Sequence, residues 1–141
     1  MTGKIFSTWD ETHSELWSHQ PIRLEHEMHK SPAFSMDDLA KLIEGYPREH
    51  YSLVQTGARG TKKLWREGDI GNLSGSDVIE AISRGGLWLN MRNVAAVDSR
   101  YGKLVDRMFE EIVAKVPDFK FPKGHQESIL ISAPEIGRAH V

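Results

Sequence analysis

Two groups of side chains have the types that binding or catalysis requires. The first is His26-Glu27-Met28-His29, a compact cluster of imidazole and carboxylate groups. Two histidines three residues apart can bind a metal ion from one face of a helix. Residues 22–28 alternate like a strand, however, and a strand would turn His26 and His29 to opposite faces. We therefore expect solvated side chains here and assign no metal ligand.

The second group is Asn90 and Arg92, which alternate with apolar residues along a predicted strand and so share one face. Arginine can bind a carboxylate with two parallel hydrogen bonds, and asparagine both donates and accepts. We take both as candidates for substrate binding, with Ser132 of a later strand as a third. The alternative is a structural ion pair between Arg92 and Asp98 or Asp106.

No arrangement in the sequence indicates a catalytic residue. Glu110 and Glu111 are adjacent, and neighbouring residues of a helix do not face one another. We expect them on the solvated side of their helix. The Gly-x-Ser-x-Gly motif of many hydrolases is absent from the sequence.

Composition excludes several classes of protein. The 141 residues carry a net charge of −2, which gives no basic face for nucleic acid or an anionic membrane. No apolar run approaches the ~20 residues that span a bilayer, and the N-terminus lacks the apolar segment of a signal peptide. Cysteine is absent, so no disulfide or thiolate site can form. We expect a cytoplasmic protein with a globular core.

Hydrophobic periodicity predicts alternating helices and strands. The predicted helices are 6–19, one that begins after Ser35, one after Ser74 and a long one after Asp98. The predicted strands are 22–28, 51–56, 87–92 and 129–132, with a polar connection over 57–71. Three consecutive apolar residues at 129–131 predict burial on both faces of the last strand. Such alternation is also typical of a parallel doubly wound sheet, which stays open as an alternative although no Gly-x-Gly-x-x-Gly motif is present.

Several segments together resemble a known family. They are the strand at Tyr51, 66–75 (REGDIGNLSG), 87–92 (LWLNMR), 104–112 (LVDRMFEEI) and 129–134 (ILISAP). Their order and spacing, over most of residues 5–134, resemble the N-terminal half of bacterial cupin-like proteins related to JmjC domains, some of which are labelled transcriptional regulators. The resemblance implies an α+β chain: an N-terminal helical region followed by the first strands of an incomplete double-stranded β-helix, or jelly roll.

The resemblance also implies a function for the parent protein. In the family, a His-x-Asp pair follows the strand equivalent to 129–132, and a later histidine completes an iron-binding triad. The parent would be an Fe(II)- and 2-oxoglutarate-dependent oxygenase or a cupin-like binder without that chemistry, such as a regulator. It would act on an unknown small molecule or protein and could form a homodimer. Asn90, Arg92 and Ser132 would face the cavity.

The last seven residues, 135–141, match one reading frame of a common sequencing adapter. We therefore expect residues 1–134 to be the N-terminal portion of one cupin-like domain and residues 135–141 to be a non-native tail. Such a fragment would lack all three iron ligands and would be inactive. The alternative is a complete small α+β interaction domain.

Sequencing the source DNA beyond the codon for Pro134 tests this expectation. We expect the reading frame to continue into His-x-Asp and a later histidine, because the resemblance places the iron ligands there. A frame that continues without them would favour the non-catalytic binder. A genuine stop codon after Val141 would favour the small finished domain.

Overall fold

The computed structural model describes residues 4–55 and 66–133, and over these ranges the chain is a mixed α+β structure. The α-helices are α1 (Glu11–Leu16), α2 (Met36–Ile43), α3 (Gly75–Ser83), α4 (Val94–Val97) and α5 (Ser99–Lys115). Short 3-10 helices are η1 (Met28–Lys30), η2 (Pro32–Phe34) and η3 (Arg48–His50). The strands are β1 (Tyr51–Gln55), β2 (Arg66–Gly68), β3 (Leu87–Arg92) and β4 (Ser128–Ser132).

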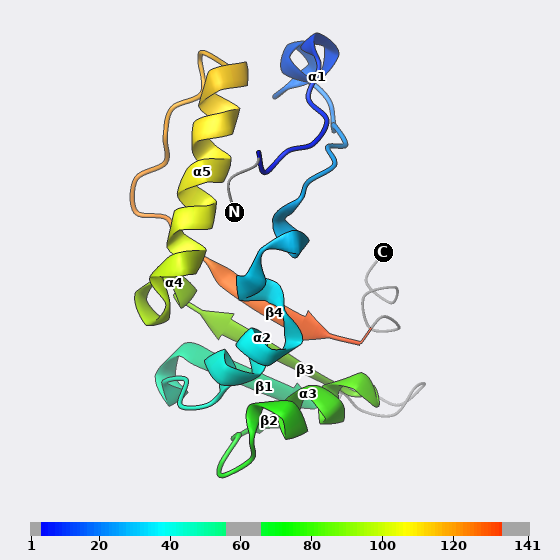
Figure 1. Ribbon diagram of the computed structural model, residues 1–141, viewed down its shortest axis with the longest axis vertical. Coiled ribbons are helices and arrows are strands. Elements are labelled where there is room, and N and C mark those ends of the chain that lie inside the picture. Colours follow the sequence, from blue (N-terminus) through cyan, green and yellow to red (C-terminus); the bar gives the residue numbers. More distant parts are fainter. Residues whose placement is uncertain (1–3, 56–65, 134–141) are drawn as a thin grey trace.

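The described strands form one sheet in the order β2-β1-β3-β4, and every neighbouring pair is antiparallel. The alternative of a parallel doubly wound sheet is therefore wrong. The connection through α3 joins β2 to β3, which run in the same direction on either side of β1, and the connection through α4 and α5 joins the antiparallel neighbours β3 and β4 (Figure 1).

Three predicted helix starts are confirmed, because each has a side chain that satisfies a free backbone N–H group of the first turn. The hydroxyl of Ser35 accepts from Asp38 N in α2, and that of Ser74 accepts from Asp77 N in α3. The carboxylate of Asp98 accepts from Arg100 N in α5.

The first predicted helix and the first predicted strand are both wrong in extent. Helix α1 begins only after Asp10, which caps it, because the chain before it is extended. Phe6 forms an isolated antiparallel bridge with His26, and Ser7 N donates to the carbonyl of Glu25 at 2.9 Å. This bridge is all that the predicted strand 22–28 contributes. Because this single bridge does not continue into a ladder of paired residues, no strand forms over 22–28.

Two elements carry no clear signal in the sequence. Strand β2 lies in the predicted polar connection 57–71, of which residues 57–65 lie outside the described ranges; pairing with Leu53, Val54 and Gln55 creates this strand. Helix α4 begins after Asn93, whose backbone is left-handed (φ 57°), a conformation that asparagine tolerates better than most residues.

The core lies between the helices and one face of the sheet. Leu89 and Met91 of β3 are fully buried, and Tyr51, Leu53, Ile129 and Ile131 flank them on neighbouring strands by register. Figure 1 shows α2 and α3 in front of this sheet. The helical residues of the core cluster are Leu42, Ile43, Val78, Ile82, Val94, Tyr101 and Leu104.

Burial of β4 on both faces was predicted and is wrong. Leu130 is 61% exposed, whereas Ile129 and Ile131 pack against the core. Alternation turns Leu130 to the face of the sheet opposite the core, so three consecutive apolar residues do not make this strand a central one. In the described part of the chain, no helix is long and apolar enough to cross a membrane.

Helix α2 passes so close to the start of α3 that no side chain fits at Gly75. A Cβ atom there would lie 1.8 Å from the carbonyl oxygen of Ala40, and Gly75 N donates to the carboxylate of Glu44 at 3.2 Å. Ordinary packing tolerates no such approach between non-bonded atoms.

We expect Gly75→Ala to lower the free energy of unfolding by about 2 kcal/mol or more, because the backbone of α2 must move away. Urea unfolding followed by circular dichroism measures the change. Ser76→Ala, one residue further along and exposed, is the matched control. Equal unfolding midpoints for the two variants would contradict the close crossing.

Candidate functional site

The three residues predicted from the sequence as ligand contacts share one face of the sheet. The register places Asn90 opposite Ser52 and Leu130, and places Ser132 opposite Trp88. Residues directly opposite in an antiparallel pair project to the same side. We call this surface the polar face; it is opposite the core. Its members are Ser52, Val54, Trp88, Asn90, Arg92, Ser128, Leu130 and Ser132.

The guanidinium of Arg92 is held on the polar face by hydrogen bonds rather than by an acid. Its Nη1 donates to the hydroxyl of Ser52 at 2.6 Å, and its Nη2 donates to the carbonyl of Glu49 at 3.3 Å. No carboxylate among the described residues forms an ion pair with Arg92, so the structural pairing with Asp98 or Asp106 is not found. Two of five N–H donors are used, and the positive charge lacks an anionic partner in the described chain.

Arg92 is also anchored through its backbone. The hydroxyl of Tyr46 donates to the carbonyl of Arg92. Burial raises the pKa of Tyr46, and the positive charge of Arg92 partly opposes this rise. The phenol therefore stays protonated and keeps its hydrogen bond at neutral pH.

Asn90 and Arg92 come together, whereas Ser132 does not join them. Asn90 and Arg92 are two residues apart on one strand and project to the same side. Ser132 lies opposite Trp88, four residues from Arg92 along β3, which is about 13 Å at the rise of a strand. A small ligand can contact the first two residues together. Ser132 could contact only a longer one.

Ser52 is the residue of this site that sequence analysis missed. It lies in the middle of β1, and its burial is intermediate. The alternation of β1 indicates that Ser52 and Tyr51 face opposite sides, but only the β1–β3 register places Ser52 beside Asn90 and within reach of Arg92.

The histidine cluster is arranged differently from the prediction. His26 and His29 do not project to opposite faces of a strand, because the chain turns into η1 and brings their ring centroids to 5.8 Å. His26 Nδ1 accepts from Met28 N, and Glu27 pairs with Lys30 at 2.7 Å. The hydrogen bond from Lys30 lowers the pKa of Glu27. Within residues 4–55 and 66–133, no three histidine, aspartate or glutamate side chains converge as metal ligands.

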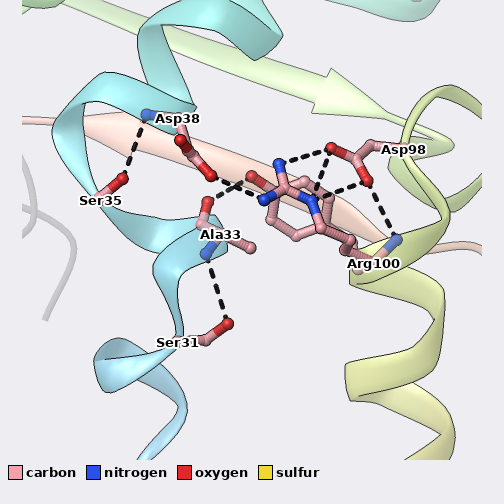
Figure 2. Close-up of polar contacts among 7 residues, drawn as sticks. Ser31, Ala33, Ser35, Asp38, Asp98 and Arg100 are labelled. Carbon is pink, nitrogen blue, oxygen red and sulfur yellow. Dashed lines mark hydrogen bonds and ion pairs between the residues drawn. The ribbon is translucent and has the colours of Figure 1, made fainter. Parts of the chain in front are cut away.

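A second polar network joins α5 to α2 (Figure 2). Arg100 contacts Asp38 at 2.6 Å and Asp98 at 2.9 Å. The next residue, Tyr101, donates its hydroxyl to the carbonyl of Ala33. Hydrogen bonding to Arg100 lowers the pKa of Asp98, and the two carboxylates raise the pKa of Arg100. Each charged group of the network has a partner of opposite charge within it, so we interpret the network as structural.

The position of Glu111 differs from the prediction. It does not lie on a solvated side of α5, because its carboxylate accepts hydrogen bonds from Ile5 N at 2.7 Å and from Phe6 N at 2.9 Å. The carboxylate ties the extended N-terminal segment to the helix.

No family model, no curated protein and no solved structure matches this chain. Its class is therefore defined by the structure alone: an α+β chain with helices on one face of an antiparallel sheet and an oriented arginine on the other face.

We expect Asp98→Asn to flatten the loss of stability in acid. The folded-state pKa of Asp98 is lowered, so its contribution is present above the unfolded pKa of about 3.9 and is lost as pH falls through the folded pKa. Asparagine keeps the helix cap but not the ion pair with Arg100. Urea midpoints measured from pH 7 down to acid test this. The matched control is Asp106→Asn on the exposed side of α5. An acid slope like that of the unmodified chain would contradict the role.

Proposed function

We propose that the polar face binds the carboxylate of a small molecule, and that the chain is the N-terminal portion of a cupin-like, JmjC-related domain. One observation carries the ligand proposal: the guanidinium of Arg92 is oriented by Ser52 and Glu49 without a carboxylate partner in the described chain. An oriented guanidinium is a specific receptor for a carboxylate, because it presents parallel N–H groups in a fixed plane.

The surroundings of Arg92 support the same ligand class. Asn90 adds an amide that can donate to a carboxylate or accept from a hydroxyl, and its burial is intermediate, as is that of Ser52 and Arg92. Partial burial strengthens a charge-assisted hydrogen bond relative to one in bulk water. The ligand that fits is a small organic acid, with 2-oxoglutarate as the representative that the family resemblance suggests.

The fold is compatible with the proposed domain. Helices cover one face of the antiparallel sheet, and the register places Asn90 and Arg92 on the other face, together with the apolar Val54, Trp88 and Leu130. In a double-stranded β-helix, a second sheet would pack on that other face and close a cavity over Arg92. The resemblance therefore assigns Asn90 and Arg92 to the cavity side.

In this proposal, iron would be bound only by the longer parent protein. The described residues offer no set of three metal ligands, and the resemblance assigns the His-x-Asp pair and the later histidine to sequence that this chain does not carry. An Fe(II)-dependent oxygenase and a non-catalytic regulator would both use the carboxylate site, and they would differ in the iron ligands.

We expect Arg92→Gln to weaken binding of 2-oxoglutarate to this chain about tenfold or more, because a charge-assisted hydrogen bond contributes about 1.5–3 kcal/mol. Titration followed by NMR chemical shifts of the sheet amides measures the affinity. Asn90→Ala should cause a smaller loss.

Arg84→Gln is the matched control, because Arg84 is an exposed arginine at the C-terminal cap of α3 and is paired with Glu80. Binding that survives Arg92→Gln, or shifts confined to residues outside β1 and β3, would contradict the site. Binding of 2-oxoglutarate but not of the uncharged dimethyl ester would identify the carboxylates as the recognised groups.

A further inference from the structure

Strand β4 forms an edge of the sheet with an unused row of backbone groups. Its backbone pairs with β3, and no other backbone group of the described residues bonds to Ser128–Ser132. Unpaired N–H and C=O groups along an edge are a template for another strand. Proteins usually protect such edges with charges, proline or a short strand.

The two edges of this sheet differ in that protection. Strand β2, at the opposite edge, is protected by its length of only three residues. Strand β4 has five residues, Ser-Ile-Leu-Ile-Ser, with no charge and no proline. The nearest charged residue before it is Glu127, whose Oε1 lies 2.6 Å from His125 Nδ1. Strand β4 is therefore the edge that can accept a partner.

The sequence of β4 reads the same in both directions. If two copies pair antiparallel about a two-fold axis at Leu130, Ser128 lies opposite Ser132 and Ile129 lies opposite Ile131. Glu127 then lies opposite Ala133, so no like charges meet. A two-fold interface of this kind needs a surface that is complementary to itself, and a palindromic strand provides it.

Both faces of the paired strands would gain contacts. Leu130, which is 61% exposed in one copy, would lie against Leu130 of the second copy on the polar-face side, at about 5 Å between Cβ atoms. Ile129 and Ile131, already packed against the core, would each extend that core across the interface. Burial of apolar surface and completion of the backbone ladder act together.

We propose that β4 is a dimerisation edge, at which two copies of this chain join their sheets antiparallel with the two-fold axis at Leu130. The self-complementary sequence selects a second copy as the partner. In the longer parent proposed above, a strand of the same chain would compete for this edge. The dimer does not depend on the carboxylate site.

Charge at the axis tests the register as well as the dimer. We expect the 141-residue chain to sediment as a dimer in the micromolar range, and both Leu130→Lys and Leu130→Glu to sediment as monomers, because like charges meet at the axis. An equimolar mixture of the two variants should restore a dimer containing one copy of each. Circular dichroism checks that each variant is folded. Met36→Lys, at another exposed apolar residue (70%), is the matched control and should remain a dimer.

A second measurement holds even if a charged variant fails to fold. The chain contains no cysteine, and opposed residues at a two-fold axis have the Cα separation that a disulfide requires. Leu130→Cys should therefore form a covalent dimer on mild oxidation under conditions in which Met36→Cys stays mostly monomeric. A monomeric unmodified chain, a dimer insensitive to charge at position 130, or assembly beyond two copies would each overturn the proposal. Arg92→Gln should leave the dimer intact, which separates this test from that of the ligand site.

Discussion

The register of β3 between β1 and β4 is the constraint on which both faces of the sheet depend. It places Leu89 and Met91 in the core with no exposed surface. The same alternation turns Asn90 and Arg92 to the opposite side. A shift by one residue would exchange the two sets, burying a guanidinium beneath the helices and exposing the core residues. Core packing and the position of the candidate site are therefore set by one interaction.

Three tyrosine hydroxyls join segments that are far apart in the sequence, and one of them, that of Tyr46, links the end of α2 to the sheet. Tyr46, just after α2, donates to the carbonyl of Arg92 at the end of β3, and Tyr101 of α5 donates to the carbonyl of Ala33. Tyr51 contacts Asp69 at 3.0 Å and accepts from Ile70 N. Each ring is buried while its hydroxyl satisfies a polar group that packing alone would leave without a partner. Arg92 is held both by its backbone and by its side chain.

The polar face and the edge of β4 are two separate surfaces of the same sheet. One side carries helices, and the other carries Arg92 with partial access to solvent. Strand β4 lies at the rim with Leu130 outward. Carboxylate binding uses the face and strand pairing uses the edge, so the two proposals rest on different atoms of the same sheet.

Local sequence determined the elements that have strong local signals. Ser35, Ser74 and Asp98 fix three helix starts through bonds within one turn, and alternation along 87–92 places Asn90 and Arg92 on one side. Only the tertiary structure decided the rest. A three-residue strand such as β2 has no pattern of its own and exists through pairing with β1. Phe6 was predicted to be helical, but it lies in an extended segment because its backbone pairs with His26 and donates to the carboxylate of Glu111. Ser52 reaches Arg92 through a register that joins residues 40 positions apart, and no local pattern encodes a distance of that kind.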